Sequence, residues 1–322
     1  MIEVSCGIPP GPDCVSHARL AEELGYERVW LYDSPALYPD VWVSLARIAE
    51  ATDRIGFGPA VLVPSLRHVM VTANAIATVD GLAPGRLTVA IGTGFTGRMA
   101  LGQPALTWAW VERYVRQLRG LLAGESVEVD GELVRLMPPT GYLDLPVDVP
   151  IRIGANGPKG LAVARELGDG VMTVGPTFPE FDRCTVLTYG TVLDAGEDAG
   201  SERAIAAAGP MAAVAYHGIY ELNPADVEGL PGGAEWRATI DAIPERERHL
   251  ALHEDHFVAV TERDRAVVTG DVLSMFTWTG EAPDLRGRLD ALAESGATEV
   301  LFAAGGPDIA RELRAFHAMA VA

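Results

Sequence analysis

Cysteine, lysine and long apolar runs are all scarce in this chain of 322 residues. The three cysteines, Cys6, Cys14 and Cys184, are too few and too scattered for a disulfide framework or a four-ligand zinc site. No apolar stretch approaches the roughly 20 residues that span a bilayer. The residues after Met1 do not form a basic segment followed by an apolar one. We therefore expect a cytoplasmic protein without a membrane segment or a secretion signal.

Positive charge is also scarce. Lysine and arginine together number 25 against 44 aspartates and glutamates, which gives a net charge of −19. Nonspecific binding to nucleic acid or to an anionic membrane requires a cationic surface. The composition therefore argues against both classes of partner, and by itself it favours no particular substrate.

The pattern that is present repeats a short apolar segment, a glycine or polar turn, and an amphipathic helix. Eight segments are expected to be strands: Ile2–Ile8, Arg28–Asp33, Ile55–Val63, Leu87–Gly92, Pro150–Ala155, Gly170–Gly175, a run within Ala204–Tyr216, and Glu299–Ala304. Their near-continuous apolar character is typical of parallel strands buried on both faces, and helices between them provide the crossovers. We predict an α/β fold in which residues 1–322 form a single (β/α)8 TIM barrel, with an open doubly wound sheet as the alternative.

The first helices are predicted at Val15–Leu24, Val41–Thr52, His68–Leu82 and Trp108–Leu122. Two segments interrupt the repeat. Ser126–Leu136 alternates around an Asp-Gly centre, which indicates a hairpin within an insertion at about residues 124–149. Asn223–Arg263 is long, charged and punctuated by prolines. We interpret it as a helical insertion over the barrel mouth.

Active sites of such barrels lie at the carboxyl ends of the strands, so the residues that end each apolar run are the candidates. Asp33 ends an apolar strand, where its carboxylate either accepts a hydrogen bond from a ligand or caps the next helix. Gly92-Thr93-Gly94 lacks the third glycine of a dinucleotide fingerprint. It either lets a flat ring approach the backbone or forms a turn that simply requires glycine. Gly175 ends a further strand.

The segment Gly154–Gly160 predicts a phosphate site. Pro158 stands where a helix begins, so the N–H groups of Lys159, Gly160 and Leu161 are expected to be free at the positive end of that helix. Lys159 is also the only lysine in the chain. The alternative is a glycine-proline loop that binds nothing.

Other motifs favour structural interpretations. His249, His253 and His256 have a spacing that can bind a metal on a helix, but no further ligand cluster accompanies them. We therefore interpret them as part of a solvated or substrate-facing helix and expect no metal. No Gly-x-Ser-x-Gly nucleophile motif is present. Trp108 and Trp110 are expected to pack in the core or at a dimer interface.

Several of these motifs together carry a family resemblance: Gly25–Asp33, Leu45–Thr52, Gly58–Val61, Pro64–His68, Ala77–Asp80, Gly85–Arg86, Gly92–Gly94, Pro150–Pro158 and Gly168–Gly170. With them the chain resembles the luciferase-like flavin oxidoreductases. Within that family it is most similar to the F420-dependent branch, on the methylenetetrahydromethanopterin reductase pattern. The likeness is good over roughly the first 175 residues and loose over Gly280–Ala315.

The resemblance implies coenzyme F420, or FMN as the alternative, held in a homodimeric enzyme with a small-molecule substrate. It implies a non-proline cis peptide at Ala60–Val61 against the cofactor ring, and it implies that Asp33 contacts the ring system. It further implies that Gly92, Thr93 and Gly94 line the pocket and that Arg98 contacts the coenzyme tail. The coenzyme phosphate would be held by the turn that contains Asn156, Gly157, Pro158, Lys159, Gly160 and Leu161.

Two positions depart from the family pattern. F420-dependent sugar-phosphate dehydrogenases have His and Glu where this chain has Ser34 and Phe95, so the resemblance argues against sugar-phosphate oxidation. Phe95 instead indicates a less polar substrate, reduced by hydride transfer. Ser34, Tyr216, His217 and His256 are the candidate proton donors. The alternatives are an FMN-dependent luciferase-like monooxygenase and a flavin-binding protein without turnover.

Overall fold

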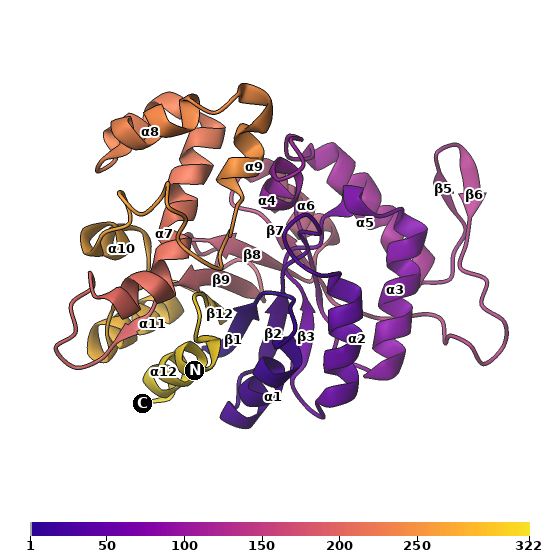
Figure 1. Ribbon diagram of the computed structural model, residues 1–322. Coiled ribbons are helices and arrows are strands. Elements are labelled where there is room, and N and C mark those ends of the chain that lie inside the picture. The colour runs from indigo at the N-terminus through magenta and orange to yellow at the C-terminus, as the bar shows by residue number, and fades with distance from the viewer. Residues whose placement is uncertain (1) are drawn as a thin grey trace.

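A computed structural model describes residues 2–322, which form a barrel of parallel strands with helices around it (Figure 1). The barrel strands in chain order are β1 (Glu3–Ile8), β2 (Arg28–Leu31), β3 (Gly56–Pro59), β4 (Val89–Ile91), β7 (Ile151–Gly154), β8 (Gly170–Val174), β9 (Cys184–Tyr189) and β12 (Glu299–Ala303). They hydrogen-bond in the order β3-β2-β1-β12-β9-β8-β7-β4. Parallel bridges from Phe57 to Leu87 and from Leu62 to Ile91 join the two ends. The predicted (β/α)8 barrel is therefore confirmed.

Helices connect most of the strands. They are α1 (Cys14–Leu24), α2 (Val41–Ala51), η1 (Pro64–Leu66), α3 (Val69–Leu82), α4 (Phe95–Met99), α5 (Trp108–Leu122), α6 (Pro158–Leu167), α11 (Ala282–Glu294) and α12 (Ile309–Val321). The four early helices predicted from periodicity are found within a few residues of their expected bounds. No helix within residues 2–322 is both long enough and apolar enough to cross a bilayer.

The prediction of a strand within Ala204–Tyr216 was wrong. That run lies in α7 (Glu202–Leu222), a helix capped by the Ser201 side chain, and the barrel strand at this place is Cys184–Tyr189. The run is rich in alanine, which strongly favours helix once enough consecutive residues can form it. Two threonines make Cys184–Tyr189 look partly polar, although Thr185 and Thr188 are buried. Tyr216 and His217 consequently lie on a helix and not at a strand end.

A second hydrophobic cluster lies outside the barrel. It extends from Ala204 to Leu273 and so includes α7 as well as the segment expected to be an insertion. Its other elements are η2 (Pro224–Gly229), α8 (Gly233–Asp241), η3 (Glu245–Glu247), α9 (Arg248–Leu252) and α10 (Gly270–Phe276). Figure 1 shows α8 and α9 at the end of the barrel toward which β1 to β3 point. This helical segment therefore stands at the end where barrel active sites occur.

The early hairpin consists of β5 (Val127–Val129) and β6 (Glu132–Val134), which pair antiparallel. Asp130 and Gly131 at its turn both have positive φ, as a two-residue hairpin turn requires. Figure 1 shows the hairpin projecting beside α3 and α5, on the outside of the barrel. A further short parallel pair, β10 (Val192–Leu193) with β11 (Gly280–Glu281), joins the two flanks of the helical segment.

The barrel interior contains an ion pair among apolar side chains. Glu299 is fully buried, pairs with Arg152, and accepts the Trp30 indole N–H at 3.1 Å. Although burial opposes ionisation, Arg152 and Arg28 hold the pKa of Glu299 below its ordinary value. The carboxylate is therefore charged and links strands on opposite sides of the barrel.

Candidate active site

Asp33 lies directly after β2 at the barrel mouth, and its carboxylate already has partners from the protein. Oδ2 accepts the Val63 N–H at 3.0 Å, and the Arg67 guanidinium donates to both oxygens at 2.9 and 2.8 Å. Burial raises the pKa of Asp33 above its ordinary value, against the opposing effect of Arg67 and the Val63 N–H. Asp33 thus fixes the segment that follows β3 to the end of β2.

Of the two roles considered for Asp33, the structure contradicts that of a helix cap. Helix α2 is capped by Asp40, whose Oδ1 accepts the N–H groups of Trp42 and Val43 at 2.9 and 3.1 Å. Arg67 also donates to the second oxygen of Asp40 at 3.0 Å, so it bridges the two carboxylates. Asp40 is closer to the helix start, which is where a cap must be.

The peptide bond between Ala60 and Val61 is cis, as expected. The Val61 side chain lies against two glycines, one after β4 and one in β7: a Cβ at Gly92 or at Gly154 would lie 2.8 Å from a Val61 methyl. A Cβ at Gly94, which has φ of +78°, would lie 2.4 Å from a Val63 methyl. These glycines therefore make room for the valines of the third strand, and half-buried Thr93 lies between two of them.

The turn before α6 is built by Asn156. Its amide donates to the Val174 carbonyl and accepts the Val174 N–H, both at 3.0 Å, which joins this turn to the end of β8. The Leu161 N–H was expected to be free, but it donates to the Gly157 carbonyl at 3.0 Å because it completes the first turn of the helix. Lys159 and Gly160 keep their N–H groups without a partner among residues 2–322.

Space around this turn is open on one side. A Cβ at Gly157, or at Gly175 with its φ of +93°, would meet nothing within 4 Å, and Pro158 and Lys159 are exposed. On the other side Gly160 is in contact with Trp108, so that tryptophan packs under the turn as expected of a core residue. The arrangement leaves two amide donors and one ammonium at an accessible helix N-terminus.

Arg98 lies at the end of α4, away from those amides in sequence but on the same end of the barrel. It donates to the Pro104 carbonyl at 2.6 Å and to the Ser65 hydroxyl at 2.5 Å. Ser34 is buried, and its hydroxyl lies close to Gly97 of the same short helix. Phe95 begins α4 and is 36% exposed, with its ring 3.7 Å from the place of a Cβ at Gly218. Helix α7 therefore reaches the barrel mouth at Phe95.

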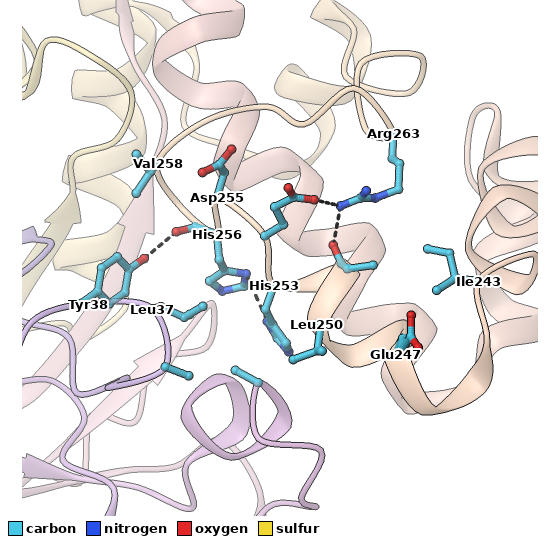
Figure 2. Close-up of a pocket in the computed structure, with 14 residues that line it drawn as sticks. Leu37, Tyr38, Ile243, Glu247, Leu250, His253, Asp255, His256, Val258 and Arg263 are labelled. Carbon is cyan, nitrogen blue, oxygen red and sulfur yellow. Dashed lines mark hydrogen bonds and ion pairs between the residues drawn. The ribbon is translucent and has the colours of Figure 1, made fainter.

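A cavity of about 800 Å³ opens between the β2–α2 loop and the helical segment. Leu37, Tyr38, His253 and His256 line it (Figure 2). The Tyr38 hydroxyl donates to the His256 carbonyl at 2.5 Å, which ties the loop to the helical segment. The cavity is large enough for a small organic ligand.

The three histidines of the sequence motif separate in the fold. His253 and His256 follow α9 in irregular backbone and face each other, with their Nδ1 atoms 3.4 Å apart. His249 lies instead beside Gly102. Among residues 2–322 no group of three or more His, Cys, Asp or Glu side chains is arranged to hold a metal ion.

His217 joins this group from α7. Its Nε2 lies 3.0 Å from Oδ1 of Asp264, its ring stacks on Trp236, and its ring centroid is 6.3 Å from that of His256. Two carboxylates that orient these rings, Asp264 and Glu221, had no expected role, and neither had Arg67. Each of these three residues is far from its partner in sequence, so no local motif links the two. The only signal available in the sequence was a charged residue within an otherwise apolar segment.

Comparison with known proteins identifies the family of this chain. Residues 5–186 match the family described as luciferase-like monooxygenase. The chain belongs to the luciferase-like monooxygenase family. The resemblance inferred from the sequence motifs is thereby confirmed.

Some of the similar proteins are named for coenzyme F420. The 5,10-methylenetetrahydromethanopterin reductase of Methanolobus tindarius is 28% identical over 303 residues, which cover 90% of this chain and 89% of that protein. The F420-dependent glucose-6-phosphate dehydrogenase of Beutenbergia cavernae is 34% identical over 179 residues, covering 49% and 51% respectively. Among solved structures, the coenzyme F420-dependent tetrahydromethanopterin reductase of Methanopyrus kandleri aligns with a TM-score of 0.71 and 20% identity, over 99% of this chain and 98% of that one. That likeness supports the luciferase-like barrel fold.

Proposed function

We propose that this chain is an F420-dependent oxidoreductase, which transfers a hydride between the deazaflavin and an unsaturated small organic substrate at the barrel mouth. The observation that carries the proposal is the pair of free amides at the start of α6, close to the only lysine. They lie on a luciferase-like barrel, and some proteins similar to this chain are named for F420. Coenzyme F420 supplies the hydride chemistry when it is bound. The protein supplies a binding surface, a water-poor pocket and a path for a proton.

The residues present fit such a coenzyme. The N–H groups of Lys159 and Gly160, together with the Lys159 ammonium, match a phosphate, because a helix N-terminus carries partial positive charge. Gly157 and Gly175 leave open space beside these donors. In the proposed arrangement the ring system lies against Ala60–Val61, with Gly92, Thr93 and Gly94 on the adjoining strand and Asp33 holding the third strand in place.

The same geometry bears on the substrate. Phe95 and Gly218 present an apolar edge next to the mouth, and Ser34 is the first polar group beyond Asp33. A sugar phosphate would need charged partners at these positions. We therefore expect a less polar substrate, such as a carbonyl compound, an activated alkene or imine, or an electron-poor aromatic. A homodimer is part of this proposal, and light scattering of the purified protein tests it.

Titration of the purified protein with F420 and, separately, with FMN tests the proposed function. We expect saturable binding of F420 that is weakened about tenfold by Lys159→Gln, since a charged hydrogen-bond donor is lost at the phosphate. Arg165→Gln is the matched control, because Arg165 lies in the same helix but pairs with Glu180 near its other end. Absence of F420 binding, or equal effects of the two variants, would refute the assignment.

The family description itself favours one alternative, an FMN-dependent monooxygenase. In that case FMN would bind more tightly than F420, and reduced FMN would support oxygen consumption. Binding of either coenzyme without turnover of any substrate would instead indicate a flavin-binding protein. The titration, combined with measurements of oxygen consumption and of hydride transfer, therefore separates the three functions.

A further inference from the structure

Two buried histidine nitrogens near the barrel mouth have no partner. They are Nδ1 of His217 and Nε2 of His256, in side chains that are 4% exposed. A buried ring nitrogen without a hydrogen bond is unfavourable in a stable core, and such groups often serve function. The other nitrogen of each ring has a partner: Nε2 of His217 lies 3.0 Å from Oδ1 of Asp264, and Nδ1 of His256 lies 3.4 Å from Nδ1 of His253.

Hydrogen bonds to carboxylates determine which nitrogens carry protons. Nε2 of His253 lies 2.9 Å from Oε1 of Glu221, so it donates its N–H to the carboxylate. The Nδ1 of a neutral His253 is then an acceptor, and His256 donates its Nδ1–H across the 3.4 Å separation. The consequence is that Nε2 of His256 carries a lone pair and no proton.

The environment of His256 keeps this ring neutral. Burial is the largest cause that lowers the pKa of His256 well below its ordinary value. A positive charge on His253 or His217 would lower it further, while Asp264 acts in the opposite direction. The other groups around it are Glu221 behind His253 and the Tyr38 hydroxyl, which donates to the His256 carbonyl. None of these groups hydrogen-bonds to Nε2.

Contacts of its neighbours connect the His256 ring to the β2 end of the barrel. Its neighbour Phe257 packs on Tyr32, the residue before Asp33, with centroids 5.6 Å apart. His256 lines the cavity together with Tyr38, and the His217 ring lies beside the His256 ring. The residue after His217 is Gly218, which faces Phe95. Figure 2 shows His253 and His256 together beside Tyr38, the side chain that comes from the β2–α2 loop.

We propose that Glu221, His253 and His256 form a proton relay that serves hydride transfer, with Nε2 of His256 as the atom that exchanges a proton with the substrate. This inference rests on the proposed oxidoreductase function. His217, oriented by Asp264, is the positioning residue beside it. Glu221 is at the outer end and is the part of the relay in contact with solvent, with its side chain 10% exposed.

The relay moves one proton and no electrons. When a substrate hydroxyl is oxidised, its O–H bond breaks and an Nε2–H bond forms on His256, while the hydride leaves the substrate carbon for the coenzyme. The Nδ1 proton of His256 passes to Nδ1 of His253, and the Nε2 proton of His253 passes to Glu221. In the direction of reduction, Glu221 first takes up one proton from solvent. The same steps then run in reverse, and Nε2 of His256 gives its proton to the substrate.

The tautomers can be tested without coenzyme or substrate. In ¹⁵N NMR of the protein labelled at its imidazole nitrogens, we expect Nε2 of His256 to be unprotonated and Nδ1 protonated at neutral pH. Glu221→Gln should weaken this preference in both rings, since an amide can donate to His253 as well as accept. A protonated Nε2 in the wild-type protein, or spectra unchanged by Glu221→Gln, would overturn the relay.

The second test measures hydride transfer from reduced F420, with acetone and 2-cyclohexenone as the carbonyl and activated-alkene probes. His256→Asn keeps an amide able to donate toward His253 but has no group at the Nε2 position. We expect it to slow transfer about 100-fold or more while F420 binding stays unchanged, and His249→Asn to act like the wild type. An unaltered rate in His256→Asn would refute the assignment.

The two levels of proposal fail in different ways. If F420 does not bind, the proposed function fails, whereas the apo-protein tautomers still report on the relay. If neither probe is reduced, the tautomer measurement alone decides. Normal F420 binding together with a protonated Nε2 in His256 would leave the oxidoreductase intact and remove the relay.

Discussion

Replacing Glu299 by glutamine should destabilise the protein strongly. The carboxylate is fully buried, pairs with Arg152, and accepts hydrogen bonds from Trp30 at 3.1 Å and from Thr185 at 3.3 Å. The amide preserves the size of the side chain but leaves the 5% exposed Arg152 without a counter-charge. Breaking a buried ion pair in this way costs about 3–5 kcal/mol. That is a large share of the roughly 5–15 kcal/mol by which a folded domain is stable.

Urea unfolding followed by circular dichroism measures this loss as a lower transition midpoint. Glu180→Gln is the control, because its ion pair with Arg165 is on the surface and should change nothing measurable. The double variant Glu299→Met with Arg152→Met should recover much of the loss, since both charges are then removed. A loss below about 1 kcal/mol in Glu299→Gln would refute the reasoning, because it would mean that Arg152 does not depend on this carboxylate.

Two further predictions concern packing and pH. Gly160→Ala should cost about 1–3 kcal/mol in urea unfolding, because the new Cβ would lie 2.4 Å from a Trp108 ring atom, whereas Gly157→Ala meets nothing within 4 Å and should be neutral. Equal effects of the two substitutions would contradict the packing argument. The side-chain hydrogen bond from Arg203 lowers the pKa of Glu197 to about 2. The ionised Glu197 carboxylate therefore stabilises the fold fully at pH values above its ordinary pKa of 4.5. Glu197→Gln should therefore be less stable than the wild type near neutral pH, and the difference should disappear as the pH falls from about 4.5 toward about 2; a difference that persists at the acid end would exclude this cause.

Much of the fold was predictable because its signals are local. Pro158 after a short apolar strand marks the start of a helix, and the Asp130-Gly131 centre marks a hairpin, since both depend on backbone geometry within a few residues. The same is true of the motifs that carry the family resemblance. The wrong prediction of the seventh strand shows the limit of local patterns. Cys184–Tyr189 is a strand because it pairs with β8 and β12, and no local pattern encodes that pairing.

The candidate site divides in the same way. Local patterns in the chain were enough to predict the barrel, the family, and the helix N-terminus that presents Lys159 and Gly160. The folded arrangement was needed to show that the Asp33 carboxylate is hydrogen-bonded by Arg67 and Val63, and that Glu221, His253 and His256 form one connected group. The physical reason is that a buried polar group takes its partners from whatever the packing brings within hydrogen-bond distance, and those partners lie about 30 residues away along the chain.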